Sequence, residues 1–338
     1  ILGRMGISDL VRSVENFINE EGVKRSRRAG WKPMVQTYRG YGTEERVHVI
    51  GRVLMNNPKT PSNQVQRGYR QFFTIQVGDV PVTVNVNGQE VQTLTNNNGY
   101  FDVLIEDHGL APGWQEVSVT TPGAEAVTAE VLVTPKGQKL GLISDIDDTI
   151  MVTNLPRAMH AAYNSWFLRT NNRQPIEGMD RFYNELIHDE PDAPVFYLST
   201  GAWNTYDTLV KFIEEHNLPK GPLLLTDWGP TPTGMFRSGM EHKKVQLRNL
   251  LIDYPDTEWI LVGDNGQHDP LIYGNLVAEH PNAVRGVATR ELTPAEHVLS
   301  HGTATSLTGP ARTDREGVPA ISAKDGDALL AKYLRNPF

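Results

Sequence analysis

The chain has 338 residues, 40 acidic against 32 basic side chains, a net charge of −8 and no cysteine. The length predicts two domains at ~100–200 residues each. The acidic balance argues against a nucleic-acid-binding protein, and the lack of cysteine excludes thiol nucleophiles, thiolate metal sites and disulfides. Any chemistry must use carboxylates, histidines, lysines, hydroxyls or a bound metal.

The sequence predicts no transmembrane segment, because no run approaches the ~20 apolar residues that span a bilayer. Charged residues such as Arg4, Asp9 and Arg12 stand where a signal peptide would be apolar. The first residue is Ile1 rather than methionine, so removal of an N-terminal segment stays an open alternative. We expect a cytoplasmic protein, with peripheral membrane association as the alternative.

Apolar residues recur at helical spacing between Ile7 and Glu21, which predicts one amphipathic helix. A basic run from Lys24 to Arg28 follows it. Such a pair is compatible with binding to a membrane surface, but we favour a docking helix whose C-terminal dipole attracts cations. The Gly-rich stretch from Arg39 to Thr43 is interpreted as a linker, so residues 1–44 are predicted to be a helix and linker.

From Arg46 the hydrophobic period becomes two, which is typical of half-buried strands. Asn87-Gly88 and Asn98-Gly99 suit hairpin turns with positive φ, and short strands at this spacing predict an all-β sandwich domain at residues 45–136. The predicted strands are Val47–Leu54, Phe72–Val77, Val82–Val86, Glu90–Leu94, Tyr100–Ile105, Glu116–Thr120 and Val127–Val133. This domain lacks a catalytic constellation, which leaves packing, or recognition of an unknown partner through its loops, as its role.

After Lys136, short apolar runs alternate with helical patterns, which predicts an α/β domain with a doubly wound parallel sheet at residues 137–338. The runs predicted as buried strands are Leu140–Ser144, Val195–Leu198, Leu223–Leu225, Ile260–Val262 and Val284–Ala288. In such a sheet the ligand binds beyond the carboxyl ends of the strands. Functional residues are therefore expected directly after these runs.

Three carboxylates follow the first run, at Asp145, Asp147 and Asp148. An acidic turn that caps a helix explains one of them, but neighbouring carboxylates repel each other unless a cation joins them. Because hard divalent cations prefer oxygen ligands, the three carboxylates predict a Mg²⁺ site.

Polar residues also follow later runs. Ser199 comes directly after the second run and could present its hydroxyl to a phosphoryl oxygen, although Ser-Thr-Gly is also an ordinary turn sequence. Lys243 and Lys244 open a helix, where a cation opposes the helix dipole, and a solvated surface pair is the alternative. Asp264 and Asp269 lie in a Gly-containing loop after the fourth run.

This order of motifs resembles the haloacid dehalogenase superfamily of phosphotransferases. The matching residues are Asp145-x-Asp147-x-Thr149, Ser199, Lys243 and Gly263-Asp264-x4-Asp269. A narrower resemblance is to the actin-patch-associated phosphatidate phosphatase family in its bacterial form. It rests on Asp145–Thr153, Trp203-Asn204, His242-Lys243, Gly263–Pro270 and, in the preceding β-domain, Tyr38–Thr43. Ser199–Trp203 departs from that family, which more often has a second Ser or Asn and a Pro before the Trp.

The resemblance implies a Mg²⁺-dependent phosphatase that forms an aspartyl-phosphate, with phosphatidate as the substrate. Asp145 would be the nucleophile and Asp147 the general acid and base. Ser199 would bind a phosphoryl oxygen, and Lys243 would neutralise developing charge. The implied metal ligands are Asp145, the Asp147 backbone carbonyl and Asp264, and the implied supporting residues are Thr149, Asp269 and Lys244. Asp269 would bind the metal through water or orient Lys243, which is preferred over Lys244 because Leu247 follows it by four residues.

Three alternatives stay open. The substrate could be a soluble metabolite or a phosphoprotein instead of a lipid. A non-catalytic lipid-sensing module would have lost Asp145 or Asp147, and both are present. The β-sandwich could instead bind a protein or glycan partner and deliver the phosphatase to it.

Overall fold

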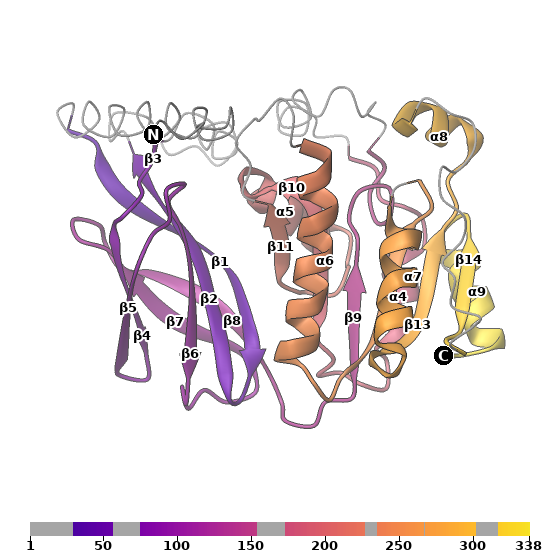
Figure 1. Ribbon diagram of the computed structural model, residues 1–338, viewed down its shortest axis with the longest axis horizontal. Helices are drawn as coiled ribbons and strands as arrows, with labels where there is room; N and C mark the ends of the chain where they lie inside the picture. Colours follow the sequence, from indigo (N-terminus) through magenta and orange to yellow (C-terminus); the bar gives the residue numbers. More distant parts are fainter. Residues whose placement is uncertain (1–29, 57–74, 154–172, 227–234, 267, 302–316) are drawn as a thin grey trace, which may run out of the picture. The chain divides into compact units, whose positions relative to one another are not determined.

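The computed structural model describes residues 30–56, 75–153, 173–226, 235–266, 268–301 and 317–338 (Figure 1). It divides into two compact units, Ile1–Val133 and Thr134–Phe338. The helix predicted at Ile7–Glu21 lies outside the described residues. Within the part of the chain that the structure describes, no helix is both long and apolar enough to cross a membrane.

The first unit is all-β. Its strands are β1 (Lys32–Thr43), β2 (Arg46–Asn56), β3 (Ile75–Gln76), β4 (Pro81–Val86), β5 (Gln89–Leu94), β6 (Tyr100–Glu106), β7 (Gly113–Thr120) and β8 (Val127–Thr134). They form one eight-stranded sheet in the order β3-β2-β1-β8-β7-β4-β5, and β6 pairs with β2. The predicted sandwich therefore takes the form of a single sheet around one core, because β1 connects β2 to β8.

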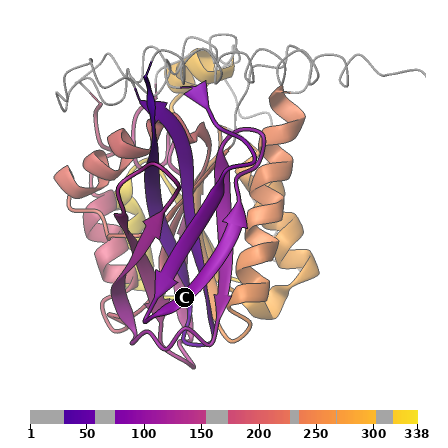
Figure 2. The same ribbon diagram turned by 90° about the vertical axis from the view of Figure 1, so that its left-hand side faces the viewer.

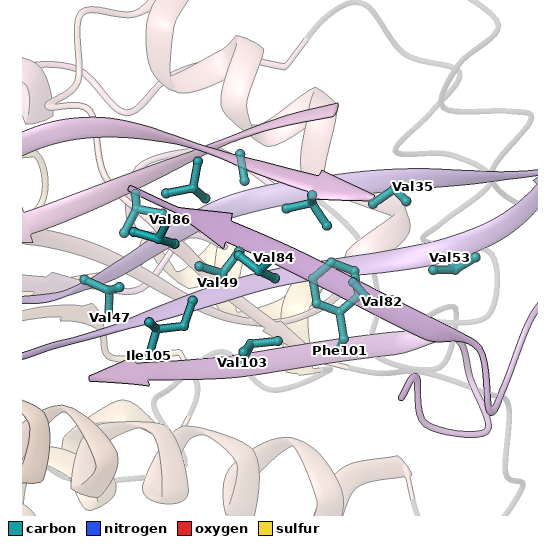
Figure 3. Packing of buried hydrophobic residues seen from close by; sticks show 14 of the residues in the cluster. Val35, Val47, Val49, Val53, Val82, Val84, Val86, Phe101, Val103 and Ile105 are labelled. Carbon is teal, nitrogen blue, oxygen red and sulfur yellow. The ribbon is translucent and has the colours of Figure 1, made fainter. Parts of the chain in front are cut away.

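The period of two in the sequence produces that core. Alternate residues of β4 and β6 are buried, among them Val84 and Val103. Figure 3 shows these side chains converging with those of β2. Burial of each such side chain contributes about 1.5–3 kcal/mol. The alternation of valines and other apolar residues with polar residues thus accounts for the core of this unit.

The prediction of a linker from Arg39 to Thr43 is wrong, because these residues lie within β1. The register between β1 and β2 shifts between Tyr38 and Tyr41, where the strand is irregular. A Cβ atom on Gly40 would lie 2.2 Å from the His48 carbonyl oxygen. The glycines of this stretch therefore allow the backbones of β1 and β2 to approach closely. A strand segment with this role has the same glycine-rich composition as a linker.

The second unit contains a six-stranded sheet in the order β11-β10-β9-β12-β13-β14. Its strands are β9 (Leu140–Ser144), β10 (Val195–Ala202), β11 (Leu223–Thr226), β12 (Glu258–Asp264), β13 (Val284–Arg290) and β14 (Ala320–Ala323). All neighbouring strands are parallel. The chain adds β10 and β11 on one side of β9 and then β12 to β14 on the other, so the strand order reverses at β9.

Helices cover both faces of this sheet. The described helices of this unit are α4 (Met179–Leu186), α5 (Tyr206–Glu215), α6 (Met235–Asp253), α7 (Asp269–Glu279), α8 (Pro294–His301) and α9 (Gly326–Arg335), with short 3-10 turns at Trp203–Thr205 and Pro281–Ala283. Figure 2 shows α6 and α7 on one face and α4 and α5 on the other. Where strand order reverses, the carboxyl ends of β9, β10 and β12 form the place for a ligand.

Candidate active site

The site begins where β9 ends, at Asp145. The backbone of β9 lies between β10 and β12, and the Asp145 N–H donates to the Val262 carbonyl at 2.9 Å. Below it, the Ser144 hydroxyl donates to the Asp145 carbonyl at 2.6 Å and lies 2.6 Å from the Tyr183 hydroxyl. Asp145 is only 2% exposed, and its backbone N–H and carbonyl groups both form hydrogen bonds. Its carboxylate is therefore attached to a buried and fixed backbone.

Lys243 reaches this carboxylate from α6. Its Nζ donates to Asp145 Oδ1 at 2.6 Å and to Asp269 Oδ1 at 2.7 Å. Burial acts to lower the pKa of Lys243, but the charges of Asp145 and Asp269 outweigh it and raise the pKa, so the ammonium stays charged. Lys244 instead lies near the surface, where its Nζ donates to Glu241 Oε1 at 3.0 Å. Of the two lysines, the structure brings Lys243 to Asp145.

Two more carboxylates come from the end of β12 and the start of α7. Asp264 and Asp269 are both 0% exposed, and their oxygens lie within 4.8 Å of an Asp145 oxygen and of each other. We call Asp145, Asp264 and Asp269 the acidic cluster. Asp264 Oδ1 accepts from the Gly266 N–H at 2.6 Å. Asp264 Oδ2 and Asp269 Oδ2 are buried and have no hydrogen-bond partner among the described residues.

The acidic cluster carries more negative charge than Lys243 can neutralise. Burial raises the pKa of Asp145 to about 8, against the opposing effect of Lys243. Burial and the neighbouring Asp269 raise the pKa of Asp264 well above its usual value. Buried carboxylate oxygens without a partner are costly, and a hard divalent cation would give them one. The donor set of the acidic cluster therefore fits a divalent metal ion.

Asp147 accepts hydrogen bonds from two hydroxyl groups outside the acidic cluster. Its Oδ2 accepts from the Ser199 hydroxyl at 3.0 Å, and its Oδ1 accepts from the Thr153 hydroxyl at 3.3 Å. Ser199 is 1% exposed and lies within β10, before the strand ends at Ala202, and its Oγ also accepts from the Gly201 N–H at 2.9 Å. The structure thus brings together Asp147 and Ser199, as the strand-end argument predicts.

The turn after β9 holds these groups in place. Thr149 Oγ1 donates to Asp145 Oδ2 at 3.2 Å. Asp148 adopts a left-handed backbone with φ of 57°, which is uncommon for a residue other than glycine. Its Oδ1 accepts from the Thr153 N–H at 2.9 Å. Asp148 therefore shapes the turn that follows Asp145 and Asp147.

Two residues that support the site have no role in the sequence-based prediction. Thr153 stands at the end of the motif that begins at Asp145, so its position was a usable signal. Tyr183 lies on α4 among buried Met179, Phe182 and Leu186. Its helical spacing predicts a core residue, and nothing in the sequence connects it to Ser144.

The raised pKa of Asp145 predicts a pH-dependent stability in metal-free buffer. Its pKa is 3.8 in an unfolded chain and about 8 in the folded one, so the folded state binds the extra proton between these values. The unfolding free energy therefore falls as pH rises through this window. We expect wild type to lose stability relative to Asp145→Asn as the pH rises from 4 to 8, measured by urea unfolding with a chelator. A difference that stays constant across this range would contradict the burial of an ionisable Asp145.

Comparison with known proteins shows what the site is similar to. Residues 140–291 match the model of the phosphatidate phosphatase APP1 catalytic domain. Phosphatidate phosphatase APP1 of Saccharomyces cerevisiae is 28% identical over 233 residues, which cover 65% of this chain and 39% of the yeast protein. An uncharacterised protein of Schizosaccharomyces pombe is 26% identical over 154 residues, which cover 45% of this chain and 25% of that protein. The chain thus spans well under half the length of either relative.

Solved structures add no further support. A carbohydrate acetylesterase from Xanthomonas citri aligns with a TM-score of 0.26 and 11% identity, over 74% of this chain and 65% of the other. A likeness this weak establishes neither fold nor activity. The match at residues 140–291 contains the whole acidic cluster together with Asp147, Ser199 and Lys243. This segment of the second unit therefore resembles the catalytic domain of phosphatidate phosphatase APP1.

Proposed function

We propose that this protein is a Mg²⁺-dependent phosphatase that acts on phosphatidate through an aspartyl-phosphate intermediate. The observation that carries the proposal is the buried acidic cluster, which shares Lys243 between Asp145 and Asp269 at the carboxyl end of the sheet. The substrate is proposed from the name of the yeast relative, phosphatidate phosphatase APP1.

The first half-reaction uses Asp145 as the nucleophile. A carboxylate oxygen of Asp145 attacks phosphorus, and the bond between phosphorus and the alcohol oxygen breaks. Asp147 gives its proton to the leaving oxygen. The Lys243 ammonium lies 2.6 Å from Asp145 Oδ1 and favours the ionised form of Asp145 against the effect of burial, and a bound Mg²⁺ would favour it further. The products of this step are the alcohol, here diacylglycerol, and a phosphorylated Asp145.

The second half-reaction returns the enzyme to its starting state. Water attacks phosphorus, and Asp147 accepts the proton of that water. The bond between phosphorus and Asp145 breaks, which releases inorganic phosphate and the carboxylate. Ser199, whose hydroxyl donates to Asp147 at 3.0 Å in this structure, would donate instead to a phosphoryl oxygen in both steps.

Asp145, Asp264 and the backbone carbonyl of Asp147 would hold Mg²⁺, with Asp269 binding through water or orienting Lys243. Bound there, the ion would supply charge neutralisation for the phosphoryl oxygens. Asp269 Oδ1 accepts from Lys243, and its Oδ2 has no partner among the described residues, so both roles are compatible with one side chain.

The second unit is proposed to have the doubly wound fold of the haloacid dehalogenase superfamily. The reversal of strand order at β9 supports this, since Asp145 and Asp147 follow β9, Ser199 lies in the second half of β10 and Asp264 ends β12. Residues 137–338 are proposed as the phosphatase domain and residues 45–136 as a separate binding or packing domain. The site is proposed to work on a lipid at a membrane surface from the cytoplasmic side.

The test compares phosphate release from phosphatidate vesicles and from a water-soluble phosphomonoester. We expect release from both with Mg²⁺, a preference for phosphatidate, and loss of both with a chelator that added Mg²⁺ reverses. Release from the soluble ester alone would replace phosphatidate with a soluble substrate. Release that persists in the chelator would contradict the metal-dependent mechanism.

A further inference from the structure

Arg290 is a buried charge at the edge of the site that the proposed mechanism does not use. It ends β13, where it pairs in register with Asp264 of β12. Its side chain is 7% exposed. A buried guanidinium is retained only where its donors are satisfied, so its partners indicate what it does.

Three partners surround the Arg290 guanidinium. Nη1 donates to the Asp148 carbonyl at 2.8 Å, Nε donates to the Lys324 carbonyl at 3.2 Å, and Nη2 donates to Glu296 Oε1 at 2.5 Å. Glu296 supplies the neutralising charge. It is itself fixed at the start of α8, because its Oε2 accepts from the Thr293 N–H at 2.7 Å and Thr293 Oγ1 accepts from the Glu296 N–H at 3.3 Å.

Asp148 is the partner that connects Arg290 to the site. Its backbone is left-handed, and the Arg290 bond to its carbonyl holds this uncommon conformation. The Asp148 N–H, on the other side of the residue, donates to the Met151 carbonyl at 2.8 Å. That N–H belongs to the same planar peptide as the Asp147 carbonyl, so the direction of this carbonyl follows from the conformation of Asp148.

The backbone of Arg290 also contacts the loop that carries Asp264. Its backbone carbonyl accepts from the Asn265 N–H at 2.9 Å, and Asn265 Oδ1 accepts from the Leu292 N–H at 2.8 Å. Asn265 follows Asp264 directly. One residue therefore contacts the turn that carries Asp147 through its side chain and the loop that carries Asp264 through its backbone.

We propose that Arg290 is a positioning residue that locks the Asp147–Thr149 turn against the Asp264–Asn265 loop. The inference rests on the proposed function, in which the Asp147 carbonyl and Asp264 both face one metal ion. Arg290 contacts none of the acidic-cluster side chains in the hydrogen bonds described above. Its effect on catalysis is therefore exerted through the backbone of Asp148.

The test replaces Arg290 with lysine in the full chain. A lysine keeps the charge but offers no planar fork, so it cannot reach Asp148, Lys324 and Glu296 together. The matched control is Arg285→Lys on the same strand, where the side chain is 50% exposed and paired with Glu258. Glu296→Gln is a second variant: its amide oxygen can still accept from Thr293, but its NH2 group cannot accept from Arg290, so the variant removes the charge and this acceptor together.

Amide hydrogen exchange without metal is the first measurement. We expect faster exchange in the peptide of residues 146–153 for Arg290→Lys, a smaller increase for Glu296→Gln and no change for Arg285→Lys. Unchanged exchange in that peptide for a folded Arg290→Lys would overturn the proposal. If Arg290→Lys does not fold, Glu296→Gln decides, and unchanged exchange for that variant overturns the proposal.

Metal binding and turnover are the second measurement. Supporting residues around a metal site typically change affinity or activity by about 10–100-fold, and we expect losses of that order in Mn²⁺ affinity and in kcat for Arg290→Lys, with KM nearly unchanged. Unchanged Mn²⁺ affinity and kcat would overturn the catalytic part of the proposal. If wild type neither binds Mn²⁺ nor releases phosphate, the proposed function fails, and the exchange rates alone decide whether Arg290 holds the turn.

Discussion

Asp145→Asn is expected to abolish phosphate release while the protein stays folded. Asparagine has nearly the same shape, so Thr149 and Lys243 keep a neighbour at this position, but the amide cannot attack phosphorus. Loss of a nucleophile typically lowers turnover by several orders of magnitude, and we expect on the order of 10⁴-fold or more. The measurement is phosphate release with Mg²⁺ under saturating substrate, together with circular dichroism.

The control for this experiment is Asp192→Asn, which removes an exposed carboxylate from the turn before β10. It should retain full turnover. Comparable turnover in Asp145→Asn and wild type, with the substitution confirmed by mass, would reject Asp145 as the nucleophile. Loss of turnover accompanied by unfolding would instead identify Asp145 as a structural residue.

Lys243→Met is expected to lose both stability and activity. Nζ of Lys243 is the cation that contacts Asp145 and Asp269, and all three side chains are at least 96% buried. Breaking a buried ion pair from one side leaves uncompensated charge, which typically costs about 3–5 kcal/mol of unfolding free energy. The carboxylates offset part of this cost by taking up protons, so the loss should be larger at pH 8 than at pH 5.

The control for Lys243 is its neighbour. Lys244→Met removes a partly exposed pair with Glu241, which is worth about 0–1 kcal/mol. We expect Mg²⁺ to restore part of the stability of Lys243→Met without restoring its turnover, since the ion replaces the missing charge but not the ammonium beside Asp145. Equal unfolding free energies for the two lysine variants in urea would show that the buried ammonium does not stabilise the fold.

Much of the candidate site could be predicted because parallel strands gather their carboxyl ends. Asp145, Ser199 and Asp264 are far apart in the sequence, yet each directly follows an apolar run, and the sheet order brings these runs together. Lys243 was harder to assign, since Lys244 carries the same charge one residue later. The two lysines lie on different faces of α6, which places Lys243 in the core and Lys244 near the surface.

Other features could not be predicted because they depend on long-range contacts. Arg290 lies 142 residues from Asp148, and no local pattern marks it as a partner of that turn. The stretch from Arg39 to Thr43 is rich in glycine, and its composition therefore predicts a linker. In the structure its glycines allow two paired strands to approach closely. In both cases the missing information is which backbone lies against which.

The central claim is that Asp145 forms a covalent bond to phosphorus during turnover. It is tested most directly by quenching the wild-type enzyme during turnover with Mg²⁺ and phosphatidate, then reducing acyl phosphates with borohydride and mapping the modified residue by mass spectrometry. We expect reduction at position 145 in the wild-type enzyme quenched during turnover. We expect no reduction at this position in the wild-type enzyme before substrate is added. Modification at another residue, or full turnover with no acyl phosphate at Asp145, would contradict the central claim.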